Sequence, residues 1–284
     1  MTQVYDRSLG RLINEPQFAE TGLRRLYGPS WMRPITNRLI TQPWVSRWAT
    51  WPQRQPRSAR RIQEFVDRYR VDLEDYPARP YRSFADFFTR DFRAGARPVD
   101  HTPGRLIAPA DSRLTVYPVA DRQTISVKGF HYTIPELVGR EVSDVASHCL
   151  VFRLTVADCH RYCFIDDGVV VGSYELPGKL NTVSAWSDGR VRVLAENHRV
   201  VTQLDSSHFG RVTVIEVGAL FVGRIINHRL SRAVRGQEKG YFAYGGSTIV
   251  ILLDGVELDA DIVAQSRVGV ATKVQRGSGI GQRR

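Results

Sequence analysis

The feature that most constrains the fold is a series of short apolar segments that follows Arg97 and Pro98. Each is rich in Val and Ile and is bounded by Gly, Asp, Asn or Pro, which is typical of strands. The segments are 114–119, 150–156, 168–176, 191–194, 200–204, 212–217, 220–226, 248–253 and 267–270. Only 134–139 looks helical. The pattern predicts a mostly antiparallel β-sheet or barrel-like domain over residues 96–284, ending in a loose tail from Arg276.

Residues 1–95 have a different pattern, with apolar residues at helical spacing and prolines between them. It predicts helices near 14–28 and 31–40, and a third that begins at Ser58 and carries Ile62, Phe65, Val66 and Tyr69 on one face. Ser83 with Asp86 three residues later is a capping-box signature for a fourth helix. The fold class is therefore predicted to be α+β, with a helical region at 1–95 before the β domain.

The helical region is basic and rich in tryptophan. The chain has a formal charge of +11, and four of its five tryptophans alternate with arginines: Trp31, Trp44, Trp48 and Trp51 with Arg33, Arg38, Arg47 and Arg54. Such a composition suits an anchor at the surface of an anionic membrane. It also suits a platform for single-stranded nucleic acid or a subdomain that buries its aromatic rings. The composition alone leaves these three interpretations open.

Targeting and redox signals are few. No run of about 18 apolar residues predicts a transmembrane helix, and the N-terminus lacks the basic and apolar segments of a secretory signal. The three cysteines, Cys149, Cys159 and Cys163, have no C-x-x-C spacing. An odd number of cysteines is typical of a reducing compartment.

Three short stretches hold residues that could carry chemistry: Asp111 within 108–112, His160 within 158–163, and Ser247 within Gly245-Gly246-Ser247-Thr248. Each has an ordinary structural interpretation, a turn for the first and last and a structural histidine for the second. Metal binding is a poor explanation, because Cys159, His160 and Cys163 have no second cluster of ligands at the usual spacing. A serine, a histidine and an aspartate remain, which are the parts of an activated nucleophile.

These stretches belong to a longer set of motifs in one order: 83–90 with 97–98, 109–111, 127–132, 158–161, 177–183, 197–200, 217–219, 236–242 and 245–248. In sequence and order this set resembles the phosphatidylserine decarboxylase family. The resemblance covers about residues 80–255. Many motifs in one order are far more specific than any single motif.

The resemblance implies a self-processing enzyme. Ser247 would attack the carbonyl of Gly246, and the chain would split between 246 and 247. Residue 247 would become a pyruvoyl cofactor on a fragment 247–284, and this group would form a Schiff base with the substrate amine. His160, oriented by Asp111, would be the base for cleavage and the acid for the later protonation. Gly245, Thr248 and Cys163 are candidate supporting residues, and no metal is expected.

The chain departs from the family pattern at three positions. The family commonly has a second histidine where this chain has Cys163, a tyrosine at Cys159 and a glycine at Ser112. These differences bear on the division of roles between site residues, and they leave room for an altered substrate.

The expected reaction is decarboxylation of phosphatidylserine to phosphatidylethanolamine at an anionic membrane. The enzyme would be peripheral on the cytoplasmic face, with fragments 1–246 and 247–284 associated, a homodimer as a further possibility, and no nucleic acid as partner. The alternatives are a pyruvoyl decarboxylase of a free amino acid or another amino-carboxylate, and a relative without processing that binds lipid or nucleic acid.

Overall fold

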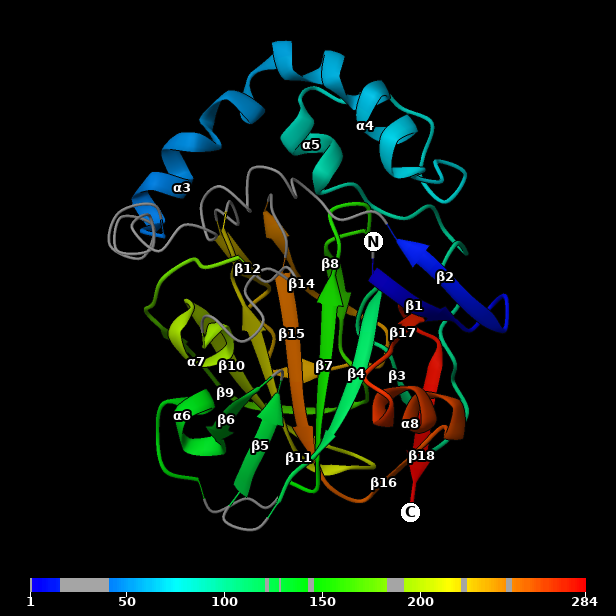
Figure 1. Cartoon of the computed structure of the whole chain (residues 1–284), viewed down its shortest axis with the longest axis vertical. Helices are drawn as coiled ribbons and strands as arrows, with labels where there is room; N and C mark the ends of the chain where they lie inside the picture. Colours follow the sequence, from blue (N-terminus) through cyan, green and yellow to red (C-terminus); the bar gives the residue numbers. More distant parts are fainter. Residues whose placement is uncertain are drawn as a thin grey trace.

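A computed structural model of the whole chain describes residues 2–15, 41–120, 123–127, 129–142, 146–182, 192–220, 224–243 and 247–284. The predicted helix near 14–28 lies outside these ranges from residue 16 onward, and its first two residues belong to a strand. The predicted helix at 31–40, with Trp31, Arg33 and Arg38, lies outside them entirely. Gly245 and Gly246 lie outside them as well. The described residues form an α+β fold, as the sequence predicted, with the helices of residues 43–88 above one end of a large sheet and the others beside it (Figure 1).

The main sheet has ten strands in the order β13-β9-β10-β11-β15-β7-β4-β17-β1-β2. Every neighbouring pair is antiparallel except β1 and β17, which are parallel. The strands are β13 (Arg232–Ala233), β9 (Gly168–Leu176), β10 (Arg199–Ser206), β11 (Gly210–Val217), β15 (Ser247–Leu253), β7 (His148–Leu154), β4 (Ser112–Pro118), β17 (Ala271–Val274), β1 (Thr2–Asp6) and β2 (Arg11–Glu15). The sheet is open in the described residues, with edges at β13 and β2. The predicted, mostly antiparallel β-sheet is confirmed, and no closed barrel forms among the described residues.

Both faces of the main sheet are covered. One face packs against helices α6 (Ile134–Val138) and α7 (Val193–Glu196) and the hairpin β5 (Thr124–Val127) and β6 (Phe130–Thr133). The other packs against two smaller sheets and α8 (Ala260–Arg267). These sheets are β12 (Arg224–Asn227), β14 (Glu238–Ala243) and β8 (Arg161–Cys163), then β16 (Val256–Leu258), β18 (Gly279–Arg283) and β3 (Arg105–Ile107).

Strand β15 lies near the middle of this arrangement, and all seven of its residues are buried. Ile249 and Ile251 face one core, whereas Val250 and Leu252 face the other. This explains why its sequence is a continuous apolar run rather than an alternating one. Each such side chain contributes about 1.5–3 kcal/mol by leaving water.

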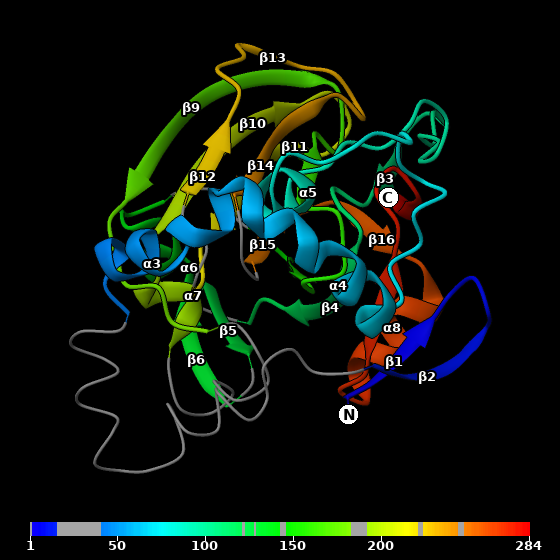
Figure 2. The ribbon, with the colours of Figure 1, turned by 90° about the horizontal axis from the view of Figure 1, so that it is seen from above.

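The helical part forms an arc over the end of the sheet where β15 begins (Figures 1 and 2). It consists of α3 (Pro43–Ala49), two 3-10 segments at Trp51–Arg54 and Pro56–Arg61, α4 (Ile62–Tyr69) and α5 (Phe84–Phe88). No helix among the described residues has the length and apolar composition needed to cross a membrane. Ser83 caps α5 as predicted, since its hydroxyl accepts a hydrogen bond from the Asp86 amide.

The predicted role of Ser58 was wrong. Ser58 lies inside a 3-10 segment, and α4 begins four residues later without a side-chain cap. Its hydroxyl accepts a hydrogen bond from the Phe84 amide at 2.8 Å and lies within bonding distance of the main-chain oxygens of Gln53 and Gln55, just before its segment. Ser58 therefore ties the arc to the start of α5 instead of starting a helix.

The two ends of the described chain also differ from the sequence prediction. Strands β1 and β2 lie in the region predicted to be helical, and β1 pairs with β17 near the C-terminus. The predicted loose tail forms β18, which lies between β16 and β3. The predicted strand at 267–270 is instead the end of α8 and the turn that follows it. The large sheet is therefore completed by both ends of the chain.

Candidate active site

Ser247 is the first residue of β15 and is fully buried. It pairs with Leu154, the last residue of β7. Its hydroxyl has no hydrogen-bond partner among the described residues. Leaving a buried hydroxyl unpaired costs about 1–3 kcal/mol, so a functional reason for this one is worth seeking. A serine nucleophile that awaits a reacting carbonyl is such a reason.

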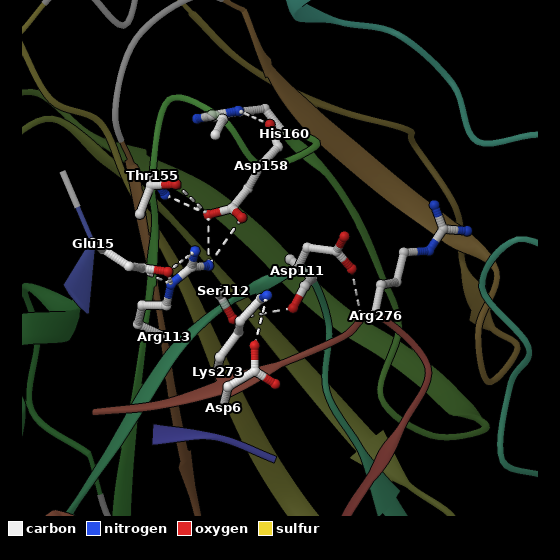
Figure 3. A network of polar contacts seen from close by, with 12 residues as sticks. Asp6, Glu15, Asp111, Ser112, Arg113, Thr155, Asp158, His160, Lys273 and Arg276 are labelled. Carbon is white, nitrogen blue, oxygen red and sulfur yellow. Dashed lines mark hydrogen bonds and ion pairs between the residues drawn. The ribbon is translucent and has the colours of Figure 1, made fainter. Parts of the chain in front are cut away.

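His160 lies in the loop that connects β7 to β8 and is also fully buried. Its Nδ1 is 3.0 Å from the main-chain oxygen of Asp158 (Figure 3). A carbonyl oxygen can only accept, so Nδ1 carries the hydrogen, and a neutral ring has its lone pair on Nε2. The Phe88 ring packs against the imidazole at 4.2 Å between centroids. His160 is therefore held as the tautomer that a base acting through Nε2 requires.

The strand pairings bring His160 and Ser247 to the same end of the sheet. The Phe242 amide of β14 donates to the His160 main-chain oxygen at 3.0 Å. Ser247 pairs with Leu154, which precedes the His160 loop. Only residues 244–246, which lie outside the described ranges, separate Ala243 at the end of β14 from Ser247. The expected cleavage site thus lies between β14 and β15. Strand β14 bonds to His160, and β15 pairs with the residue at which the His160 loop begins.

Helix α5 and the residues after it hold this loop from above. The Arg90 guanidinium is fully buried and donates to the Ala157 oxygen at 2.7 Å. Cys159 Sγ is 3.4 Å from the Arg90 oxygen, and Arg161 Nε donates to the Thr89 oxygen at 3.0 Å. The motif at 83–90 therefore supplies the covering layer of the site, which excludes water from His160.

Asp111 lies just before β4, and its carboxylate is held by arginines. Arg97 donates to both of its oxygens at 2.7–3.1 Å, and the Arg276 amide donates to Oδ1 at 2.8 Å. No hydrogen bond joins Asp111 to His160 among the described residues. In this structure the contact that orients His160 comes from the Asp158 carbonyl, so the predicted orientation by Asp111 is not observed.

Cys163 lies at the end of β8, beside the Asp111 turn. Its amide donates to the Pro109 oxygen at 2.9 Å, and its Sγ is 3.9 Å from the Ala108 oxygen. Burial raises the pKa of its thiol to about 11, although the nearby Arg276 acts in the opposite direction. A thiol that stays protonated near neutral pH is a poor base or nucleophile. Cys163, which occupies the position of the family's second histidine, therefore cannot act as a base near neutral pH.

Thr248 follows Ser247 in β15 and is buried between Arg153 of β7 and Val217 of β11. Its place is set by the sheet. In the described ranges, no group of three or more His, Cys, Asp or Glu side chains is placed to hold a metal ion.

The described parts of three motifs, at 177–182, 197–200 and 217–219, form one cluster beside the start of β15. Asn197 connects them, because its amide group donates to the oxygens of Asn181 and Gly218 at 2.9 and 2.7 Å. A Cβ on Gly178 would lie 2.5 Å from the Glu196 oxygen, so only glycine fits there. These motifs are structural supports for the strands beside Ser247.

Sequence reasoning missed the roles of Arg90, Arg276 and the Asp158 carbonyl in holding the site. Arg90 falls within a quoted motif, which was a usable signal. Arg276 lay in the segment predicted to be a loose tail, and a main-chain oxygen gives no signal in the sequence.

Comparison with known proteins gives one consistent result. The family model described as phosphatidylserine decarboxylase matches residues 84–282. A phosphatidylserine decarboxylase proenzyme 2 from Clostridium acetobutylicum is 38% identical over 286 aligned positions, covering 98% of this chain and 98% of the relative. Phosphatidylserine decarboxylase proenzymes from Desulfitobacterium hafniense and Chlamydia pneumoniae are 32% and 33% identical, and each match covers at least 97% of both chains.

Proposed function

The chain belongs to the phosphatidylserine decarboxylase family, and we propose that it converts phosphatidylserine to phosphatidylethanolamine and carbon dioxide with a pyruvoyl group made from its own Ser247. The observation that carries the proposal is the buried hydroxyl of Ser247, at the start of β15. This hydroxyl has no hydrogen-bond partner among the described residues. His160 lies in the adjoining loop, as the parts of an activated nucleophile require.

Self-cleavage would proceed in two stages. Ser247 Oγ attacks the Gly246 carbonyl carbon and gives its proton to Nε2 of His160, and the peptide C–N bond is exchanged for an ester while the nitrogen of residue 247 becomes an amine. Loss of the Cα proton of residue 247 then expels the Gly246 carboxylate and leaves a dehydroalanine. Its imine form is hydrolysed, which releases ammonia and leaves the pyruvoyl group on fragment 247–284.

The residues around Ser247 fit such a group. Once formed, it supplies a ketone that condenses with the substrate amine and accepts the electron pair left when carbon dioxide departs. His160 is the candidate to return a proton to the carbon that lost the carboxylate. Phe88 and the buried Arg90 cover the His160 loop, so water is excluded where this proton is held.

The two fragments would stay together after cleavage. Fragment 247–284 supplies β15, flanked by β11 and β7, and β17, flanked by β1 and β4. It also supplies β18, between β16 and β3. Dissociation would expose five consecutive apolar residues at 249–253, each worth about 1.5–3 kcal/mol. A homodimer remains a prediction, which light scattering of the processed protein tests.

The arc of helices is the proposed membrane contact, on the cytoplasmic face where anionic lipid attracts basic residues. Trp44, Trp48 and Trp51 follow one another at intervals of about one helical turn and are 64%, 84% and 61% exposed. Arginines 54, 57, 60 and 61 are exposed along the adjoining 3-10 segments. Exposed tryptophan beside arginine is the composition of an interfacial anchor, which supports the membrane interpretation over aromatic burial.

The reaction is tested by carbon dioxide release from vesicles that contain phosphatidylserine, measured beside free serine and other free amino acids. Release from the lipid alone is the expected result. Release only from a free amino acid would replace the substrate while keeping the chemistry.

The membrane contact is tested by cosedimentation with the same vesicles. The variant Trp44→Ala/Trp48→Ala should bind about 10-fold more weakly, because binding follows the apolar area inserted. The matched control is Val169→Ser/Val171→Ser, which removes residues 52% and 49% exposed on β9, away from the arc. Equal binding by both variants would remove the tryptophans from the membrane contact.

A further inference from the structure

We propose that Glu15 and Arg113 are positioning residues for His160. A partly to fully buried chain of ion pairs, Glu15–Arg113–Asp158, fixes the carbonyl oxygen to which His160 donates (Figure 3). The inference rests on the proposed role of His160 and assigns a part in the chemistry to the N-terminal hairpin.

The first link joins the hairpin to the main sheet. Arg113 of β4 donates from Nε to both oxygens of Glu15 at 2.9 Å, and from its NH2 group to Oε1 at 2.5 Å. Its remaining terminal nitrogen donates to both oxygens of Asp158 at 2.9 and 3.0 Å. The three side chains are 6%, 15% and 10% exposed, so solvent screens these pairs little. One guanidinium fork thus holds two carboxylates in fixed places.

The second link joins Asp158 to the histidine. Asp158 Oδ2 accepts hydrogen bonds from the Thr155 amide and hydroxyl at 2.7 and 2.8 Å, which closes the turn before His160. The Asp158 main-chain oxygen faces Nδ1 of His160 at 3.0 Å. Burial would raise the pKa of Asp158, but Arg113 and the Thr155 bonds outweigh burial and lower it. Asp158 is therefore fixed at its side chain and, through the turn, at the carbonyl that sets the ring.

The strand register explains why Glu15 is needed. Arg153, Arg113 and Lys273 lie directly opposite one another across β7, β4 and β17. Like charges at opposed positions repel, so each needs a carboxylate nearby. Asp6 of β1 bonds Lys273 at 2.9 Å, and Glu15 of β2 bonds Arg113. Without Glu15, Asp158 is the one carboxylate left on Arg113 among the described residues, and the guanidinium loses the contact that sets its orientation.

The expected effect falls on the speed of self-cleavage. Asp158→Asn should slow cleavage by up to about 100-fold and Glu15→Gln by about 10-fold, because a catalytic group misplaced by about 1 Å costs on the order of 100-fold. Arg113→Lys should resemble Glu15→Gln, since an ammonium keeps the charge but cannot hold both carboxylates as a fork does. In the Asp158→Asn background, Glu15→Gln should have little further effect, because both act through one carboxylate.

The matched control is Asp6→Asn. It removes an ion pair from the same hairpin and the same row of cations, but its partner Lys273 does not contact Asp158. It should cleave at the wild-type rate even if its melting temperature falls as far as that of Glu15→Gln. Equal slowing by Asp6→Asn would mean that the hairpin acts only by general stability.

A second measurement does not depend on activity. In the uncleaved Ser247→Ala chain, nitrogen NMR of His160 should report a single Nδ1–H tautomer, and adding Glu15→Gln should mix the two tautomers. Wild-type cleavage by Glu15→Gln, together with an unchanged His160 signal, would overturn the proposal. Normal cleavage by His160→Ala would instead overturn the role of His160, while the NMR signal would still report whether Glu15 positions its ring.

Discussion

A histidine and a serine lie near each end of the central strands, but the two pairs differ in how they bond with aspartate. At the end of β10 and β11 far from Ser247, the fully buried Asp166 accepts a bond from the Ser206 hydroxyl at 2.5 Å. It also bonds His208 Nδ1 at 3.0 Å and the Arg235 guanidinium at 2.7 Å. The side-chain oxygens of Asp166 and Ser206 all have partners in this distal cluster, whereas Arg235 Nε has none among the described residues.

At the site end, the serine and the histidine are not joined to one aspartate. Ser247 has no hydrogen-bond partner among the described residues, and His160 donates to a main-chain oxygen. The distal cluster stabilises a hairpin turn, because Ser206 also accepts from the amides of His208 and Phe209. The proposed nucleophile role of Ser247 therefore rests on its unsatisfied buried hydroxyl, rather than on proximity of the three residue types.

The largest contrast is expected between the two serines. Ser247→Ala should remain one chain, because the nucleophile is gone, and should lose no stability, because the hydroxyl it removes is buried and unpaired. Ser206→Ala should cleave normally but lose about 1–3 kcal/mol of unfolding free energy, since a charge-assisted bond to Asp166 is lost. Denaturing gels and urea unfolding check both. Cleavage of Ser247→Ala would refute the nucleophile assignment.

The two histidines give the next contrast. His160→Ala should slow cleavage by about 10²–10⁴-fold, the usual contribution of a positioned base. His208→Ala should cleave at the wild-type rate. Time courses from freshly synthesised chains measure both rates, and a reversed order would mean that the distal cluster is the catalytic one.

The two buried aspartates sharpen the comparison through pH. Burial would raise the pKa of Asp166, but bonds from Ser206, Arg235 and His208 outweigh burial and lower it, as Arg113 does for Asp158. A carboxyl whose pKa is lowered in the folded state stabilises the fold at pH values above its ordinary pKa of 3.8. This stabilisation is lost as the pH falls through the pKa of the folded state.

Asp166→Asn should therefore give a shallower loss of stability in acid, and should cost about 3–5 kcal/mol at neutral pH by leaving Arg235 unpaired. Urea unfolding at a series of pH values checks this, and cleavage should be normal once the variant is folded. An acid limb as steep as the wild type would show that Asp166 does not provide this stability.

The smallest effect is expected at Cys163. Cys163→Ala should cleave within about threefold of the wild-type rate, because its thiol has a pKa of about 11 and is not ionised near neutral pH. Slow modification of the native protein by a thiol reagent is the second expected result. A large loss of cleavage without loss of folding would give Cys163 a direct role.

The β-rich part of the fold was predictable because buried strands carry dense Val and Ile runs, as 248–253 does. The ends of the chain were not. Gly279 and Gly281 suggested a flexible tail, yet a Cβ at Gly281 would lie 2.8 Å from the Glu257 oxygen. These glycines allow close strand packing, and composition cannot separate that role from flexibility.

Ser247 and His160 could be named as candidate site residues from the sequence because motifs carry them. The ion pairs that hold the His160 loop could not be predicted. Arg113 is 98 positions from Glu15 and 45 from Asp158, and only the folded sheet brings them together. The predicted contact of Asp111 with His160 was plausible by residue type. Arg97 and Arg276 bind that carboxylate instead, and no local sequence pattern predicts these two contacts.

The most direct test of the central claim is intact mass analysis of the purified wild-type protein, before and after a carbonyl reagent. Two fragments should appear, 1–246 and 247–284, and the smaller should have no free N-terminal amine and should gain the mass of the reagent. A single unmodified chain, or a fragment that begins with an ordinary serine at 247, would contradict the proposal that Ser247 becomes the pyruvoyl group.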